Sequence, residues 1–225
     1  MRTVHRLTAA PPDPRHRPER VWYAAYGSNT DLSRLRRYLA GGTAPGGRGV
    51  HPGCRDQSDP VRSVPVELPG ILYFATESPV WTGGRAFCDP AADGRVRARA
   101  HLVTAQQFSD IAAQEMHRPP GHDLDLARAV AEGRDTLGPG HYETLVRPGF
   151  LDGLPVLTFT APWRADRVAC TAPSGPYLRC IASGLLAAGA WDAPTVARYL
   201  SEAPGASGAW TPEEIIRLTE PAPEP

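Results

Sequence analysis

VWYAAYGSN, residues 21–29, is the stretch from which the local architecture can be predicted. Its opening residues, Val21 to Tyr23, are apolar and aromatic, which favours a β-strand. Gly27, Ser28 and Asn29 favour a turn, because glycine tolerates unusual backbone angles and the other two bond to nearby backbone. Residues 31–39 then carry apolar side chains at helical spacing. The stretch therefore predicts a strand, a tight turn and the start of a helix.

This order of elements points to a binding site. Backbone N–H groups where a turn enters a helix have no partner in that helix, and they face a favourable place for an anion. The small Ala24 and Ala25 leave room for a ligand to approach the backbone. Two interpretations fit the pattern, an ordinary turn between strand and helix and a cradle for a carboxylate or phosphate.

The length and composition of the chain exclude several classes of protein. A chain of 225 residues is long enough for one domain with a proper core. Its formal net charge of zero gives no attraction to nucleic acid or to an anionic membrane. All 24 basic residues are arginine, which excludes a lysine Schiff base and a P-loop. We expect a domain over residues 21–219, a disordered tail over 1–20 and a loose tail over 220–225.

Metal and disulfide chemistry is not indicated by the sequence. The four cysteines are far apart and form no CxxC pair, so we expect reduced thiols in a cytoplasmic protein. A second group of possible ligands, His117, His122, Asp123 and Asp125, follows no established metal spacing and is expected in a solvated loop. No stretch reaches the roughly 20 apolar residues that span a bilayer. We therefore predict no metal and no other cofactor.

The elements predicted along the chain indicate an α+β fold. Residues 40–60 are rich in Gly and Pro and are expected to form a loop. Pro65 places the strand predicted over 61–68 at a sheet edge, and the alternation in 96–103 predicts that its arginines face water. The other expected strands are 70–77, 85–89, 142–147 and 154–160, and the later helices are 174–188, 192–202 and 211–219. Short strands with tight turns predict a small mixed, mainly antiparallel β-barrel flanked by helices.

Glu115 is the second residue of chemical interest. A T-x-x-Q capping box at Thr104 opens a helix over 104–116. Phe108, Ile111 and Glu115 fall on one face of that helix, so the carboxylate lies on an otherwise apolar face. Burial and the helix C-terminus both raise a carboxyl pKa, which suits a general base. A frayed helix end that turns Glu115 to water explains the same pattern.

Four pieces of the chain resemble the γ-glutamylcyclotransferase family, in the family's order. They are YAAYGSN at 23–29, VWTGGRAFCDP with Trp81, Gly83 and Gly84, RAHLVTAQQFSDIAAQE up to 115, and PSGPYLRCIASG at 173–184. The family's catalytic glutamate matches Glu115, and the tyrosine of its last motif matches Tyr177. The family joins the last two pieces by a shorter loop, so residues 116–141 look like an insertion beside the site. The resemblance implies a shared fold and shared chemistry.

The resemblance implies an enzyme that acts on γ-glutamyl amides without a metal. The α-amine of the γ-glutamyl group attacks its own γ-carbonyl, which releases 5-oxoproline and a free amine, and some family members act in this way on biosynthetic intermediates. Glu115 is the implied base. The implied substrate-binding residues are Tyr23, Ala24, Ala25, Tyr26, Gly27, Ser28, Asn29 and Tyr177.

The expected partner is therefore a small γ-glutamyl substrate, with no nucleic acid and no membrane, and the oligomeric state stays open. Two other functions are compatible with the sequence. One is a related enzyme that processes a non-glutamyl amide, and the other is a binding module of the same fold without turnover. Retention of Glu115 at the matching position argues against the second.

Overall fold

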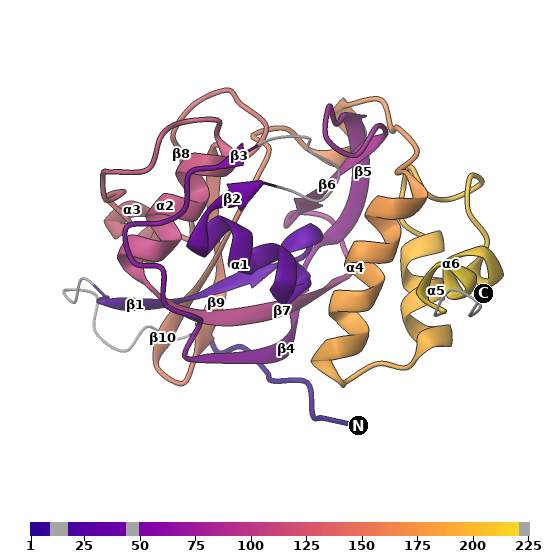
Figure 1. Cartoon of the computed structure of the whole chain (residues 1–225), viewed down its shortest axis with the longest axis horizontal. Coiled ribbons are helices and arrows are strands. Elements are labelled where there is room, and N and C mark those ends of the chain that lie inside the picture. The colour runs from indigo at the N-terminus through magenta and orange to yellow at the C-terminus, as the bar shows by residue number, and fades with distance from the viewer. Residues whose placement is uncertain (10–17, 44–49, 221–225) are drawn as a thin grey trace.

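A six-stranded sheet forms the centre of the computed structural model, which describes residues 1–9, 18–43 and 50–220 (Figure 1). The strand order is β4-β7-β1-β10-β9-β8, and the β1–β10 pair is parallel whereas the other neighbours are antiparallel. The strands are β1 (Arg20–Ala25), β4 (Arg62–Pro69), β7 (Arg95–Thr104), β8 (Arg134–Thr136), β9 (Thr144–Leu151) and β10 (Leu154–Thr160). The predicted mixed, mainly antiparallel sheet is confirmed.

Two smaller ladders accompany this sheet. A hairpin is formed by β5 (Ile71–Glu77) and β6 (Gly84–Asp89), and a short ladder is formed by β2 (Gly42–Thr43) and β3 (Val50–His51). Thr160 ties the hairpin to β10, because its hydroxyl donates to the Cys88 carbonyl at 2.7 Å and accepts from the Cys88 N–H at 3.1 Å. No ladder within the described residues joins the outer strands β4 and β8, so the sheet is not closed into a barrel by hydrogen bonds.

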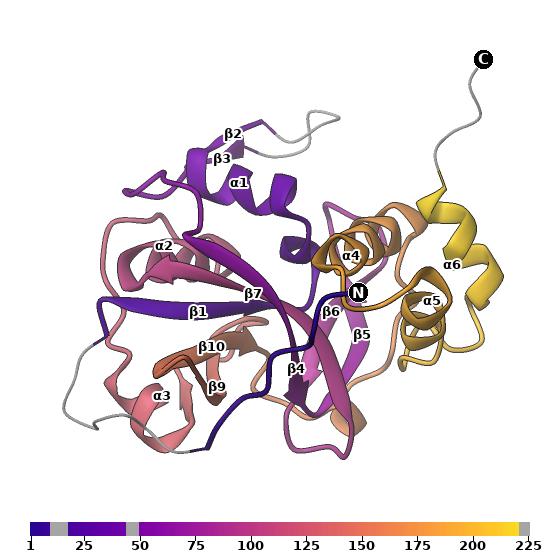
Figure 2. The ribbon, with the colours of Figure 1, turned by 90° about the horizontal axis from the view of Figure 1, so that it is seen from below.

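Two groups of helices cover the two faces of the sheet. They are α1 (Leu32–Ala40), α2 (Ala105–Glu115) and α3 (Ala127–Glu132) in one group, and α4 (Gly175–Ala188), α5 (Ala193–Ser201) and α6 (Pro212–Thr219) in the other. Successive side chains of β1 point to opposite faces of the sheet. Tyr23 therefore packs in the core with the first group of helices, and Trp22 packs in the core with the second group. Figure 1 shows α2 and α3 on one side of the sheet and α4–α6 on the other, and Figure 2 shows the same separation, with α1 and α2 to the left of α4–α6.

Local sequence signals start the helices where they were expected. The Asp31 side chain caps α1 by accepting from the Arg34 N–H at 3.0 Å. A capping box of Thr104 and Gln107 opens α2, and a second box with a proline in the first turn opens α6. Each cap satisfies N–H groups that have no partner within their helix, which fixes the helix start.

The N-terminal segment differs from the expectation of a disordered tail over residues 1–20. The Arg2 N–H donates to the Gly189 carbonyl at 2.7 Å, and the His5 N–H donates to the Pro65 carbonyl at 3.0 Å. Thr8 exchanges two backbone bonds of 2.9 Å with Phe150. The expectation is therefore wrong for residues 1–9, because backbone groups of the outer strand β4, of the part of β9 that β8 does not cover, and of the end of α4 bind them. Residues 10–17, and 221–225 of the expected C-terminal tail, lie outside the described residues.

The arginine side of β7 is also covered, contrary to the expectation that it faces water. Arg99 is 9 % exposed and His101 is fully buried. The turn after β1 lies over them, where the Arg99 guanidinium donates to the Thr30 carbonyl at 3.3 Å. The expected edge position of the strand with Pro65 is confirmed, since β4 ends the sheet.

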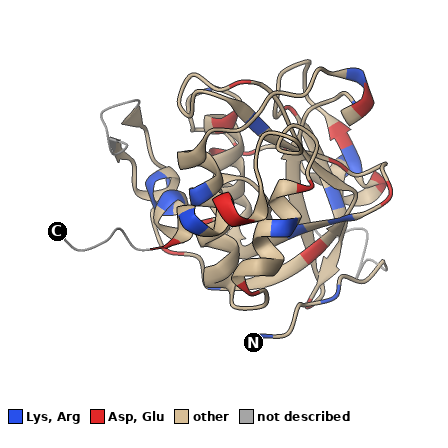
Figure 3. Ribbon diagram, turned by 90° about the vertical axis from the view of Figure 1, so that its right-hand side faces the viewer, with Lys and Arg blue, Asp and Glu red and all other residues tan. Residues whose placement is uncertain are grey.

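Charged residues are dispersed over the molecule. Figure 3, which looks onto the side with α4–α6, shows basic and acidic positions interspersed. Within the described part of the chain, none of the helices has the length and apolar character needed to cross a membrane.

Candidate active site

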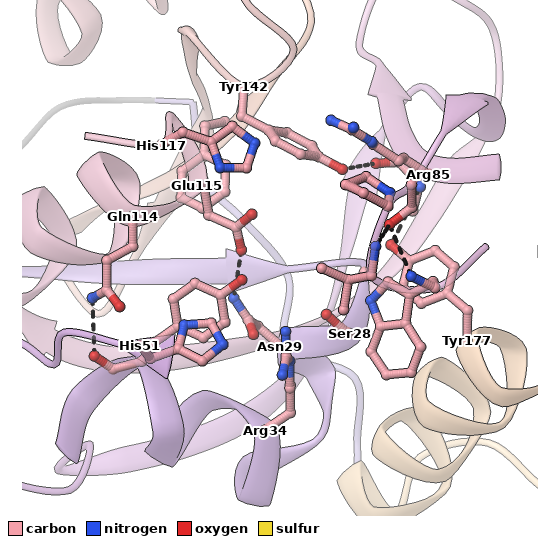
Figure 4. A pocket seen from close by; sticks show the side chains of 18 of the residues that line it. Ser28, Asn29, Arg34, His51, Arg85, Gln114, Glu115, His117, Tyr142 and Tyr177 are labelled. Carbon is pink, nitrogen blue, oxygen red and sulfur yellow. Dashed lines mark hydrogen bonds between the residues drawn. The ribbon is translucent and has the colours of Figure 1, made fainter. Parts of the chain in front are cut away.

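A cavity of about 460 Å³ lies where the turn after β1, the end of α2, the β5–β6 loop and α4 meet (Figure 4). Most of the residues predicted as a site line it together, namely Tyr23, Tyr26, Gly27, Ser28, Asn29, Glu115 and Tyr177. These residues come from three separate parts of the sequence. The fold therefore gathers the predicted residues around one volume.

Ala24 and Ala25 do not line the cavity, so their assignment as binding residues is wrong. They are 0 % and 2 % exposed and lie in the cores on opposite faces of the sheet. The Ala24 carbonyl accepts from the Thr158 hydroxyl at 2.8 Å. Their small size lets other parts of the protein pack closely on β1, and it leaves no space for a ligand.

Glu115 ends α2 and points into the cavity. Its Oε1 accepts a hydrogen bond from Asn29 Nδ2 at 3.1 Å, so the side chain is held inward and not turned to water as a frayed helix end would allow. Burial raises the pKa of Glu115, while the Tyr38 hydroxyl and the Arg34 guanidinium act in the opposite direction. A carboxyl whose pKa is raised by burial holds a proton more readily than an exposed one, which suits general acid–base catalysis.

Asn29 orients this carboxyl. Its Nδ2 donates to the Tyr23 hydroxyl at 3.2 Å as well as to Glu115, and its Oδ1 is buried without a partner. Burial lowers the pKa of His101 to about 3, so the ring is neutral. Its Nε2 lies 3.1 Å from the Asn29 carbonyl, which can only accept, so the Nε2–H donates this hydrogen bond. Asn29 caps no described helix, because Gly27 occupies the cap position of the short helix Ser28–Thr30 and Asp31 that of α1.

Gly27 is required for space and not for a positive φ. Its φ is −99°, a value open to other residues. A Cβ at this position would lie 3.1 Å from the Tyr177 hydroxyl and 3.6 Å from the Ala86 Cβ. The backbone N–H groups of Gly27, Ser28 and Asn29 donate to no atom of the described residues, so they are available to a ligand.

Tyr177 reaches the cavity from α4. Its hydroxyl oxygen accepts from the Ala86 N–H at 3.3 Å, which leaves its own hydrogen free, and its ring stacks on Trp81 with centroids 5.1 Å apart. The Cys180 thiol donates to the Ser28 carbonyl at 3.5 Å. At Gly184, a Cβ would lie 2.3 Å from the Thr30 carbonyl carbon, so this glycine allows α4 to lie directly on the turn.

The paired glycines after Trp81 have a related role. A Cβ on Gly83 would lie 2.8 Å from the Ala172 carbonyl oxygen, and one on Gly84 would lie 2.0 Å from the Thr171 carbonyl oxygen. Ser78 Oγ accepts from the Trp81 N–H at 3.1 Å within the loop before them. The glycines thus let the segment that leads into α4 pass close by, while the loop holds Trp81 beside the cavity.

Several cavity residues were not predicted. Arg34, Tyr38, Arg85 and Tyr142 all line the cavity. Arg34 precedes Tyr38 by four residues on α1, so helical spacing could have identified it as part of the same face. Arg85 donates to the Glu77 carbonyl at 3.0 Å and Tyr142 to the Ala86 carbonyl at 3.1 Å. No local pattern marks these two, because contacts between distant segments place them.

The segment 116–141 begins at the cavity and then packs on α2. Its first residues, His117, Arg118 and Pro119, line the cavity. Further along, the Leu124 N–H donates to Ser109 Oγ at 3.0 Å, and the segment also contains α3 and the unpredicted strand β8. The four possible metal ligands of this segment are exposed, and no group of three or more His, Cys, Asp or Glu side chains among the described residues is placed to hold a metal ion.

Comparison of the sequence with known proteins gives one distant relative. No protein-family model matches the chain. It is similar to histone deacetylase 5 of Arabidopsis thaliana, with 28 % identity over 201 residues that cover 81 % of this chain. The chain spans about 30 % of the length of that curated relative.

Comparison with solved structures extends over most of the chain. An uncharacterised human protein aligns with a TM-score of 0.50 and 15 % identity, over 88 % of this chain and 99 % of its own. A γ-glutamyl cyclotransferase aligns over the same shares of the two chains, with a TM-score of 0.48 and 14 % identity. YkqA of Bacillus subtilis aligns with a TM-score of 0.40 and 17 % identity, over 82 % of this chain and 55 % of its own. At such identities the comparison describes the fold alone. The chain therefore shares its overall fold with the uncharacterised human protein.

Proposed function

We propose that this protein is a γ-glutamyl cyclotransferase, which converts a γ-glutamyl amide into 5-oxoproline and a free amine. The observation that carries the proposal is the Glu115 carboxyl, which points into the cavity, is bonded to Asn29 and has a raised pKa. Tyr177 lies across the cavity from it (Figure 4).

This chemistry fits a site built for positioning and proton transfer. The nucleophile is the substrate's own α-amine, so the protein needs to hold the amine against the γ-carbonyl and to move protons. A C–N bond forms to close the lactam, and the bond from the γ-carbonyl carbon to the leaving nitrogen breaks. Two protons leave the α-ammonium and both reach the leaving nitrogen, and Glu115 carries them and ends ionised as it began.

The other cavity residues would position the substrate. The free N–H groups of Gly27, Ser28 and Asn29 would bind its α-carboxylate. The Tyr177 hydroxyl would donate to the γ-carbonyl oxygen, since its oxygen is already occupied by the Ala86 N–H. Tyr23, bonded to Asn29, would help to orient the amine.

Release of 5-oxoproline from a panel of γ-glutamyl amides tests the proposal. Glu115→Gln keeps the acceptor oxygen for Asn29 but removes the base, so its rate should fall by about 10² to 10⁴. Glu132→Gln is the matched control, because it makes the same change at an exposed residue of α3 and should leave the rate unchanged. Near wild-type activity of a folded Glu115→Gln protein would refute the assignment.

The same assay separates the alternative functions. Release of an amine without 5-oxoproline would indicate a related amide-processing enzyme. Binding of γ-glutamyl amides without release of any amine would indicate a module that has lost turnover.

A further inference from the structure

Arg34 is a buried cation in the cavity and forms no ion pair within the part of the chain that the structure describes. The residue is 7 % exposed and lines the cavity from the first turn of α1 (Figure 4). Its side chain forms no ion pair with any described carboxylate, and its Nε is buried without a hydrogen-bond partner. The guanidinium lies over the rings of Tyr38 and Trp81, at 5.4 and 5.5 Å from their centroids. Two aromatic rings thus fix its position.

A buried guanidinium in this position would be stabilised by a bound anion. Burying an unpaired charge is costly, and aromatic faces compensate for only part of the lost hydration. The sequence of residues 44–49, which precede the cavity residue Val50, contains no acidic side chain. Among the described residues, Glu115 is the acidic one that lines the cavity; the Arg34 guanidinium lowers its pKa, but the two side chains form no ion pair. The planar donor fork of arginine matches the two oxygens of a carboxylate.

We propose that Arg34 binds a carboxylate of the substrate, a role that rests on the proposed function of this cavity. Two carboxylates are available in γ-glutamyl compounds. One is the α-carboxylate of the glutamyl group, which Arg34 would then share with the N–H groups of residues 27–29. The other is a carboxylate on the released amine, in which case the enzyme prefers γ-glutamyl amino acids to γ-glutamyl derivatives of neutral amines.

Steady-state kinetics of 5-oxoproline release with three substrates separates these sources. The substrates are γ-glutamylalanine, its alaninamide analogue and its analogue with the α-carboxylate amidated. Arg34→Gln should raise KM for γ-glutamylalanine by about 10- to 100-fold, the worth of a charge-assisted bond. Arg36→Gln is the matched control, because Arg36 lies on the same helix but is exposed and paired with Asp59, and it should leave KM unchanged.

The pattern of losses assigns the carboxylate. If the released amine supplies it, wild type discriminates against the alaninamide and Arg34→Gln treats both substrates alike. If the glutamyl group supplies it, the same loss of discrimination appears for the α-amidated analogue. A KM of Arg34→Gln within twofold of wild type on γ-glutamylalanine would overturn the proposal.

Two further measurements keep this test independent of folding and of the proposed reaction. Arg34→Met retains an apolar stem and removes the unpaired charge, so the free protein should melt at or above the wild-type temperature. If wild type turns over none of the substrates, the proposed function fails, and calorimetric titration with γ-glutamylalanine then decides. Affinity that is lost in Arg34→Met supports the carboxylate site, and equal or absent affinity in both proteins refutes it.

Discussion

Replacement of Gly184 by alanine tests whether the contact between α4 and the turn maintains the site. A Cβ at this position would lie 2.3 Å from the Thr30 carbonyl carbon and 2.4 Å from the Asp31 nitrogen. Both are backbone atoms, so no side-chain rotation can relieve the overlap. Ordinary contact begins at 3.4 Å, and α4 must therefore move from the turn by about 1 Å.

Two effects of this substitution oppose each other. Alanine is about 1 kcal/mol better than glycine within a helix. Overpacking at a rigid contact costs about 1–3 kcal/mol, and more where the neighbouring atoms cannot move. The cost of the overlap should exceed the gain in helix propensity, because the overlap involves two backbone atoms. We expect a net loss of roughly 1–2 kcal/mol in the free energy of unfolding.

The shift should also reduce catalysis. Tyr177 lies two turns before Gly184 on the same helix, and its bond from the Ala86 N–H is 3.3 Å long, so a movement of about 1 Å breaks it. A misplacement of that size can cost about 10² in rate. Chemical denaturation and kcat/KM for 5-oxoproline release measure the two effects. Ser183→Ala is the control on the same helix, since it gains helix propensity without meeting the turn. If Gly184→Ala is as stable and as active as this control, the reasoning about the contact is wrong.

Three further predictions concern the cavity. The acidic limb of the rate profile should lie above the usual carboxyl range, because burial raises the pKa of Glu115 and the base must be ionised. The stability of wild type relative to Glu115→Gln should fall as the pH rises from the unfolded-state pKa towards the folded-state pKa, since the folded chain holds this proton more tightly. A limb in the usual carboxyl range would contradict both expectations. Gly27→Val should mainly raise KM by pressing on the Tyr177 hydroxyl, whereas Asn29→Ala should mainly lower kcat by releasing Glu115, so identical effects on both constants would contradict the assigned contacts. Replacement of residues 116–141 by a short Gly/Ser linker should change the preference among leaving amines more than the rate with the best small substrate, because only the start of this segment lines the cavity; an unchanged preference profile would show that the segment plays no part in specificity.

Much of this protein could be predicted from its sequence, because the signals concerned are local. Capping residues such as Thr104 act within one turn of chain, so the helix starts follow from the sequence. Pro65 has no backbone N–H to donate to a second neighbouring strand, which predicts the outer position of β4. Glu115 was identified by its position on an apolar helix face together with a family resemblance, and the structure places it in the cavity.

The tertiary structure decided what depends on contacts between distant segments. Whether Ala24 faces a ligand or a core depends on what covers the sheet, and helices and neighbouring strands cover it. The need for glycine at position 27 comes from Tyr177, which is 150 residues away in sequence, and not from its own φ. Arg34 resembles any helical arginine until the aromatic rings around it and the absence of a described anionic partner are known. The sequence by itself determined most helices and strands and singled out Glu115 as a candidate base. Packing determined the cavity, because the burial and the charge balance of a residue depend on the distant segments that surround it.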